Sequence, residues 1–329
     1  MRQPVLFAFL VVGLTFSAIW SLSAGAVPIS WQVIANTLFD LEGPKQEFIV
    51  LKSRLPRTFL AMLTGGSLAL SGAIVQALLR NPLASPKIIG INSGAALGVC
   101  LMVLILPGIS LAWLPVAAVV GGIVAALVIY LGADLRGASP VRLALVGIAV
   151  GFVFDAGVDF ILVTSSDAQF SAPLIWLTGS LWARGWTHLN LVWPWLAALA
   201  VLAMLLSYWL DLIRLGETAA TGLGLRVRVA RLILLSIAVL LAALSVSVVG
   251  VLGFVGLMAP HIARTLVGGS HKVMMPCAML VGMWLVVLAD AAGRAIAPPV
   301  EVSAGVLTAM LGAPFFVYVM IRAGRAARV

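Results

Sequence analysis

Two aspartates in an otherwise apolar stretch are the first residues that could do chemistry. Asp155 and Asp159 lie four residues apart, so a helix would place both carboxylates on one face. An acid inside a membrane helix is costly and by default suggests function, such as carrying protons. Because Asp is also a good helix cap, the pair could instead cap a broken helix near a surface. The sequence leaves both readings open.

Histidine and cysteine give no sign of a metal centre. The three histidines, His188, His261 and His271, are far apart, without metal-ligand spacing. His261 could carry a proton, but a structural role is the favoured interpretation. Cys100 and Cys277 lie in apolar runs, so we expect small core residues and neither a disulfide nor a metal pair.

Motifs for energy conversion and covalent catalysis are missing from the chain. None of the four lysines follows a glycine, so no P-loop can be written, and neither HExxH nor GxSxG occurs. We therefore expect no enzyme activity and no cofactor. If ATP drives this protein, the ATPase is another chain.

The elements that must position these residues are membrane helices. Only 9% of the 329 residues are charged and 63% are hydrophobic, whereas a soluble domain has about a quarter charged residues. The uncharged stretches are about the 20 residues needed to cross a bilayer. We predict an all-α polytopic membrane protein, a single domain over 1–329, with about ten spans. The apolar runs are 5–24, 56–78, 89–106, 113–133, 142–163, 188–210, 230–252, a short 253–265, 275–293 and 303–322.

The basic residues predict an orientation. With the N-terminus inside and the spans alternating, fourteen of the twenty Lys and Arg residues fall in inner loops. This bias predicts that both termini are cytoplasmic, and it explains the net charge of +9 without nucleic acid. Four of the six outer charges crowd into 45–57. The first run could be a signal peptide, but an uncleaved first helix is favoured because the run is long and leads into further spans.

Two inner segments could contact a soluble partner. Arg80 to Pro86 reads RNPLASP, whose two prolines stop a helix and fix an extended turn. The loop from Leu215 to Arg231 has a small-residue stretch followed by arginines. The first is either a tight turn between spans or a shaped surface for a cytoplasmic partner. The second is either a solvated amphipathic loop or a short helix that a soluble partner binds. A third motif, GFVGLMAPHIAR from Gly253, is broken by Pro260 and is expected near the bundle axis.

Together these motifs resemble a known family. The stretch from Arg54 to Gly98, RLPRTFLAML to INSGAALG, is similar to the second and third spans of FecCD-type permease subunits of bacterial ABC importers for iron–siderophores, haem and vitamin B12. The stretch from Gly253 to Arg322 is similar to the C-terminal signature of the same family. LIWLTGSLWARGW from Leu174 and RNPLASP resemble a ferric citrate permease subunit most closely.

The resemblance implies a fold and partners. It implies the ten-helix fold of type II ABC importers, such as the vitamin B12 permease, in the bacterial inner membrane. It also implies a second permease subunit, identical or paralogous, two ABC ATPase subunits, a periplasmic or extracellular substrate-binding protein and a ferric chelate as substrate. The rival is a proton-coupled secondary transporter using Asp155 and Asp159.

Residue roles also follow from the resemblance. Arg54, Arg57 and Arg294 match arginines that receive the binding protein in relatives. The loop that couples to the ATPase matches Leu215, Gly216, Glu217, Ala219, Thr221, Gly222 and Gly224. Further motif positions, read as structural, are Arg80, Asn81, Pro82, Pro86, Pro260, His261, Arg264, Asp290 and Glu301. The chain departs from many relatives at Val251-Leu252 and Val302-Ser303.

Overall fold

The computed structural model describes residues 3–39, 43–87, 90–106, 108–133, 140–165 and 174–326. Within these ranges the secondary structure is entirely helical. The longer helices are α1 (Gln3–Ser23), α4 (Leu55–Leu78), α5 (Ile91–Ile105), α6 (Leu114–Gly132), α7 (Pro140–Thr164), α9 (Trp186–Leu205), α12 (Val227–Val249), α13 (Val255–Val267), α14 (His271–Ile296) and α15 (Ala304–Ala326). Shorter ones are α2 (Trp31–Leu38), α3 (Pro44–Glu47), the π-helix η1 (Phe48–Arg54), the 3₁₀-helix η2 (Leu111–Trp113), α10 (Ser207–Arg214) and α11 (Glu217–Gly222).

Each predicted apolar run forms a helix. The prediction of an all-α chain is confirmed, because uninterrupted Leu, Val and Ala satisfy the backbone only by forming helices in lipid. Eight of the described helices are long and apolar enough to span a bilayer. The other two predicted spans, α5 and α13, are apolar but shorter. Helix α5 follows Gly90, and α13 follows the non-helical residues 250–254; Gly90 and Gly250 both have a positive φ.

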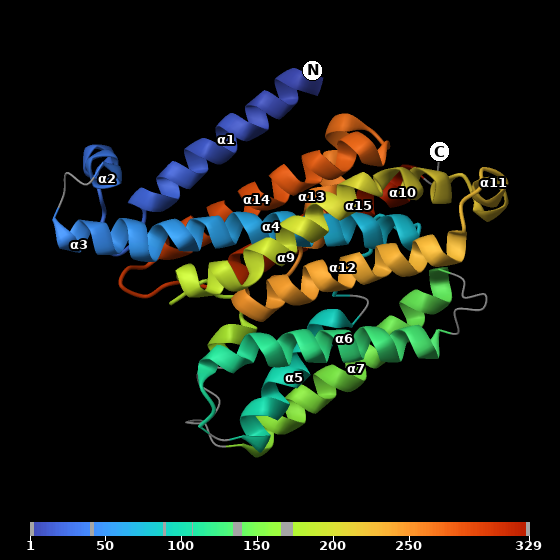
Figure 1. Cartoon of the computed structure of the whole chain (residues 1–329), viewed down its shortest axis with the longest axis horizontal. Helices are drawn as coiled ribbons and strands as arrows, with labels where there is room; N and C mark the ends of the chain where they lie inside the picture. Colours follow the sequence, from blue (N-terminus) through green and yellow to red (C-terminus); the bar gives the residue numbers. More distant parts are fainter. Residues whose placement is uncertain are drawn as a thin grey trace.

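The helices are arranged in two groups (Figure 1). Helices α5, α6 and α7 pack against one another and form one group. Helices α4, α13 and α14 form the centre of the other, with α1 packed on α14. Helix α12 contacts α4 and α9 on one side and α5 and α6 on the other, so it joins the two groups.

Small residues let the central helices approach closely. A Cβ added to Gly72 of α4 would overlap the carbonyl oxygen of Gly256 in α13, and one at Gly65 would overlap that of Gly282 in α14. Lipid provides no hydrophobic drive for helix association, so such close packing replaces it. The cysteines are buried as predicted, Cys277 in the larger hydrophobic core and Cys100 in the core of α5, α6 and α7.

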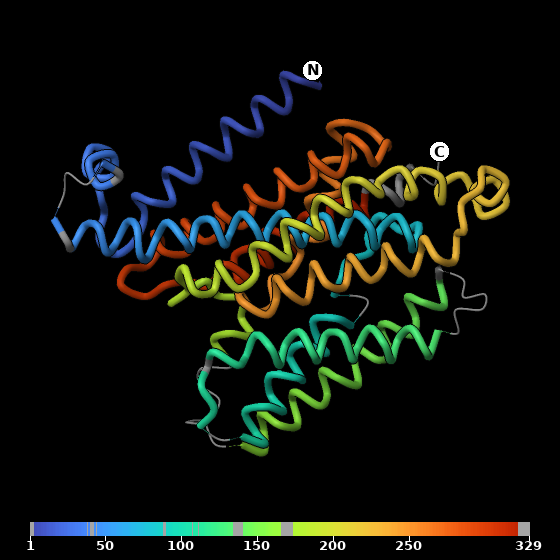
Figure 2. The backbone as a smooth tube through the Cα atoms, in the orientation of Figure 1, coloured from blue at the N-terminus to red at the C-terminus, as the bar shows by residue number. Residues whose placement is uncertain are grey.

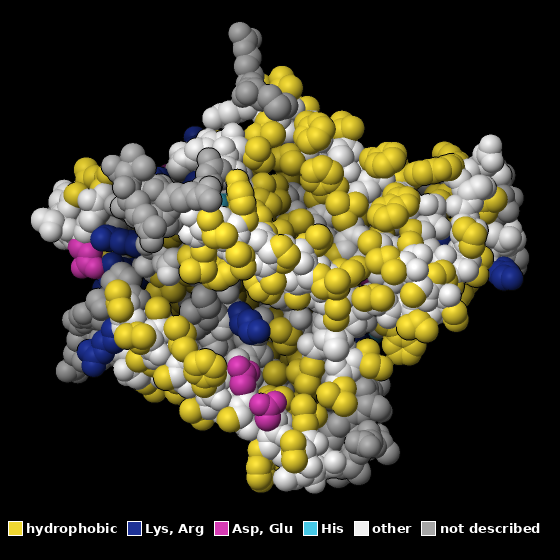
Figure 3. Space-filling view, turned by 180° about the vertical axis from the view of Figure 1, so that it is seen from behind, with side chains coloured by type: hydrophobic (Ala, Val, Ile, Leu, Met, Phe, Trp, Pro, Cys, Tyr) yellow, Lys and Arg dark blue, Asp and Glu magenta, His cyan; other side chains and the backbone are white. Residues whose placement is uncertain are grey.

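The molecular surface is apolar along the helices and charged mainly at their ends. Figure 3 shows hydrophobic side chains over most of one face; Lys and Arg lie mainly toward the ends of the long axis, with some basic and acidic side chains near the middle of the face. Helices α6 and α7 likewise expose large apolar side chains, such as those of Val120, Leu127, Phe152 and Val163. This is the surface that a lipid-embedded bundle presents.

The bundle has two ends that the loops define. We call the end with α2, α3 and η1 the α2 end, and the end with α10 and α11 the α11 end. Figure 2 shows that the first turns of α1 and the last turns of α15 lie nearer to α10 than to α2. The described part of α1 therefore begins, and that of α15 ends, nearer to the α11 end.

Some elements were not predicted. The charged stretch 45–57 was assigned to the outer side as part of a loop, but residues 48–54 form a π-helix that runs directly into α4. Helix α2 begins at Ser30, whose hydroxyl accepts a hydrogen bond from the N–H of Val33. Both elements support the charged residues at the α2 end.

Candidate functional site at the two charged ends

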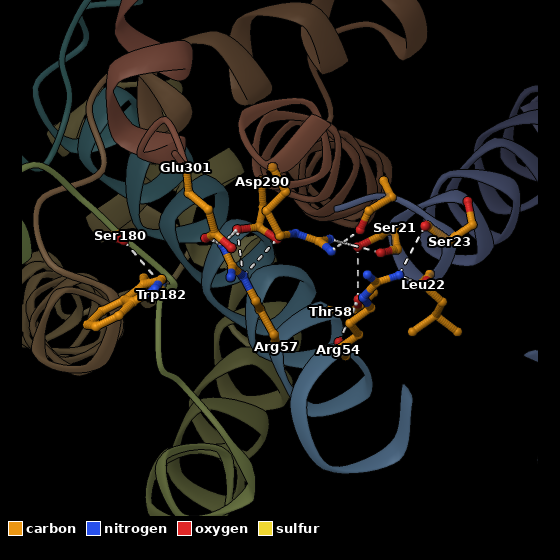
Figure 4. A network of polar contacts seen from close by, with 12 residues as sticks. Ser21, Leu22, Ser23, Arg54, Arg57, Thr58, Ser180, Trp182, Asp290 and Glu301 are labelled. Carbon is orange, nitrogen blue, oxygen red and sulfur yellow. Dashed lines mark hydrogen bonds and ion pairs between the residues drawn. The ribbon is translucent and has the colours of Figure 1, made fainter. Parts of the chain in front are cut away.

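A network of charged side chains is buried at the α2 end (Figure 4). Arg57 of α4 donates from Nε and Nη2 to Asp290 of α14 at 2.8 to 3.1 Å, and its Nη2 lies 2.9 Å from the carboxylate of Glu301. Arg294, one turn after Asp290, donates from Nε to the same carboxylate at 3.1 Å. Asp290 thus joins two arginines, and we call Arg54, Arg57, Asp290, Arg294 and Glu301 the arginine network.

The same arginines hold the end of α1. Arg54 and Arg294 donate to five backbone carbonyls at 2.5 to 3.0 Å. The acceptors are the oxygens of Ser21, Leu22, Ser23, Ala24 and Val27. The last carbonyls of a helix have no partner within it and carry partial negative charge, so guanidinium groups satisfy them well. The Ser21 hydroxyl also lies 2.9 Å from that of Thr58 in α4.

Burial corrects one expectation from the sequence. Arg54, Arg57 and Arg294 were placed in outer loops as contacts for a binding protein, but all three lie in helices and are at most 9% exposed. Their donors are turned toward Asp290 and the end of α1. Other groups of the chain therefore cover these three guanidinium groups. The most accessible member of the network is Glu301, whose side chain is 31% exposed.

Other polar side chains lie at the same end. Lys52 pairs with Glu47 at 3.3 Å, and the indole N–H of Trp186 donates to the carbonyl of Leu51. The guanidinium of Arg184 lies 3.0 Å from the Nε2 of His188. Burial lowers the pKa of Arg184 from its usual high value. The charged residues of 45–57 and Arg184 thus lie at the same α2 end.

At the α11 end, the segment from Arg80 to Pro86 forms the predicted turn. The amide N–H of Leu83 donates to the Asn81 side chain at 2.9 Å, which is an Asx-turn. Pro82 is exposed, whereas Pro86 is buried and packs near Gly256. Arg80 has a φ of 50°, in the left-handed region that a non-glycine residue seldom adopts.

The predicted coupling loop contains a short exposed helix. Gly216 has a φ of 107°, which allows the backbone to change direction after α10. Helix α11 then runs from Glu217 to Gly222. Ala220 is fully buried and anchors the helix, while the Glu217 carboxylate meets Arg231 of α12. The other residues predicted for this loop are accessible: Leu215, Ala219, Thr221, Gly222 and Gly224 are exposed, and Gly216 is half-buried. The predicted coupling residues therefore lie together in α11 and the turns on either side of it.

The third motif is a helix rather than an irregular segment. Pro260 is buried within α13, and the His261 ring meets Phe315 of α15 edge to face, with centroids 5.6 Å apart. Arg264, one turn later, approaches the Gln76 side chain of α4 at 3.5 Å. Among the described residues, no three His, Cys, Asp or Glu side chains are grouped to hold a metal.

Asp155 and Asp159 lie on α7. Both are exposed on the isolated chain, on a helix whose other exposed side chains include Phe152, Val153 and Phe160. They lie within the helix, so the interpretation as caps of a broken helix is wrong. Among the described residues, neither aspartate forms an ion pair with the arginine network.

Sequence reasoning missed one polar pair. Asp211 of α10 accepts from the backbone N–H of His271 at 3.1 Å, and its Oδ1 lies 2.6 Å from the His271 Nδ1. This pair fixes α10 to the start of α14. The two residues are 60 positions apart, so no local spacing reveals the contact.

Residues 13–322 match the FecCD transport family. The chain belongs to the FecCD transport family. Its similarity to characterised relatives extends over almost the whole length. It is 42% identical to the Fe(3+)-citrate import system permease protein YfmE of Bacillus subtilis, covering 97% of this chain and 96% of that protein. It is 35% identical to the Fe(3+) dicitrate transport system permease protein FecD of Escherichia coli, covering 95% and 97%.

A solved structure has the same fold. The chain superposes with a TM-score of 0.87 on a metal-chelate type ABC transporter in an inward-facing conformation, at 30% identity, covering 97% of this chain and 99% of that one. The FecCD chain is therefore a multi-pass membrane protein with the fold of an ABC importer permease. Proton-coupled secondary transport is not supported, because the family consists of ABC permease subunits.

Proposed function

We propose that this FecCD chain is the permease subunit of an ATP-driven importer that moves an iron chelate into the bacterial cytoplasm. The observation that carries the proposal is the full-length similarity to iron-chelate permeases, joined to the same fold. All of 1–329 serves as one transmembrane domain. Substrate passes through it without chemistry on this chain.

In this proposal the α11 end faces the cytoplasm and receives the ATPase. A short helix that is anchored by one buried residue and exposed elsewhere can insert into a groove of a partner. Glu217, Ala219, Thr221 and Gly222 supply the contact, and the turn at Asn81 and Pro82 lies at the same end. The excess of basic residues at this end supports cytoplasmic termini.

The α2 end receives the soluble substrate-binding protein. The arginine network contains three arginines and two carboxylates, so it carries one positive charge in excess. We expect a carboxylate of the binding protein to compete with partly exposed Glu301 for Arg57, while Arg54 and Arg294 keep α1 in place. The arginines thus assist docking from beneath the surface.

The transport cycle follows from these two surfaces. Two ATPase subunits close when they bind ATP and move α11. That movement passes through α10 and α12 to the spans, and the cavity between this permease and a second one, identical or paralogous, opens inward. Citrate complexes of iron are the favoured cargo because two of the relatives carry ferric citrate in their names.

Purification of the intact complex tests this assignment. An affinity tag on this chain should retain two permease subunits in total and two ATPase subunits, and mass spectrometry should detect an iron chelate on the co-purified binding protein. Isolation of a single chain that transports iron without any ATPase would overturn the assignment.

A further inference from the structure

A cavity at the α11 end is lined by basic side chains. It has a volume of about 230 Å³ and opens between α4, α10, α13 and α14. Arg80, Arg214 and Arg264 reach it from three of these regions, together with Gln76 and His271. We call it the basic pocket.

None of the three arginines is matched by a carboxylate. Each arginine donates a hydrogen bond to a neutral acceptor. Arg80 donates to the carbonyl of Ile213 at 3.2 Å, and Arg214 donates to the carbonyl of Gly269 at 2.8 Å. Arg264 donates to the Gln76 side chain at 3.5 Å. A guanidinium has several further N–H donors. The ion pairs recorded among the described residues involve other basic groups.

The nearest acid is already in use. Asp211 holds the backbone N–H and the ring of His271, as described above. Arg214 and Arg264 also repel each other electrostatically. Three like charges that converge on one cavity repel one another, and a bound anion would offset that repulsion. The left-handed backbone of Arg80 adds strain at the same place.

The chemistry of the pocket suits a phosphate group. Arginine binds phosphate oxygens through paired, charge-assisted hydrogen bonds, and several arginines can surround one phosphate. Apolar side chains follow two of these arginines in the sequence: Leu215, next to Arg214, is 65% exposed, and Leu266, two residues after Arg264, is 46% exposed. A lipid would place its headgroup phosphate among the arginines and its chains along these side chains.

We propose that the basic pocket binds the phosphate of an anionic membrane lipid. Binding would neutralise the repulsion between the arginines and fix α10, which leads into α11, against α4 and α14. The pocket shares Asn81 and Pro82 with the α11 end, but the transport assignment rests on the relatives and the fold, so failure of the lipid proposal would leave that assignment intact.

The test uses the full chain in nanodiscs. One preparation contains phosphatidylcholine alone and another contains added phosphatidylglycerol, and lipid retention is measured by native mass spectrometry with the thermal unfolding midpoint. We expect phosphatidylglycerol to remain bound and to raise the midpoint. Arg214→Gln and Arg264→Gln should each weaken retention about tenfold. Arg228→Gln, an exposed arginine at the same end outside the pocket, should change nothing.

Further measurements distinguish a lipid headgroup from free inorganic phosphate as the ligand. Arg214→Lys keeps the charge but loses the planar fork, so it should give an intermediate loss and shows that the fold survives substitution. Protection by inorganic phosphate in phosphatidylcholine alone, at equal strength, would assign the pocket to free phosphate and overturn the lipid. Equal lipid retention in all variants would overturn the pocket. Arginine dependence seen only with the ATPase present would assign it to an acidic side chain of that partner.

Discussion

At the residue scale, one carboxylate holds the α2 end together. Asp290 is 2% exposed and accepts hydrogen bonds from Arg57 and Arg294, which bring α4, α14 and the end of α1 into one cluster. A buried ion pair need not stabilise a protein more than an apolar pair would. Removing one partner, however, leaves a buried charge unpaired and is costly.

The substitution Asp290→Asn tests this role. It leaves Arg57 with Glu301 alone and Arg294 without a carboxylate, so we expect a loss of about 3 kcal/mol in stability, measured by unfolding in detergent. Asp159→Asn is the matched control, because that aspartate is exposed on α7 and should change stability by less than about 0.5 kcal/mol. Equal effects of the two substitutions would show that the network does not hold the α2 end.

The sequence identified these arginines but not their burial. Arg54 and Arg57 stand in a charged stretch, and charge in a membrane protein usually marks a loop. Their partners, Asp290 and the carbonyls after Ser21, are distant in sequence. Only the packing of α1 and α14 on α4 shows that these side chains point inward.

At the element scale, the short helix α11 is the clearest functional feature. Gly216 separates α10 from α11, and Ala220 is the buried residue of α11. The ion pair between Glu217 and Arg231 attaches α11 to α12. The small residues and the positions of glycine made this helix predictable. Helix α10 and the π-helix before α4 were not, because their amphipathic and charged residues look like loops when the neighbouring helices are unknown.

The substitution Ala219→Glu tests α11 as the contact for the ATPase. It adds a charge to the exposed side of the helix and leaves Ala220 in place, so we expect weaker association with the ATPase subunit but unchanged thermal stability. Ala112→Glu is the control, since that exposed alanine lies in the connection between α5 and α6, at the opposite end from the Arg80–Pro86 turn. A pull-down in which Ala219→Glu retains the ATPase fully would rule out α11 as the contact.

At the scale of the whole molecule, the chain is a bundle with two chemically different ends. The number and placement of the long helices could be predicted because hydropathy is a local property of the sequence. The division into an α5–α7 group and a group around α4 could not, because it depends on contacts such as that of Gly72 with Gly256. In the proposed function the α2 end serves the soluble chelate carrier and the α11 end serves the ATPase.

Uptake of radiolabelled ferric citrate into proteoliposomes is the most direct test of the central claim. The vesicles contain this permease with its partner permease and ATPase, the binding protein is outside, and ATP or a non-hydrolysable analogue is inside. We predict uptake that requires ATP hydrolysis and continues when an uncoupler removes the proton gradient. Uptake that persists without ATP and stops with the uncoupler would contradict the assignment as an ATP-driven importer.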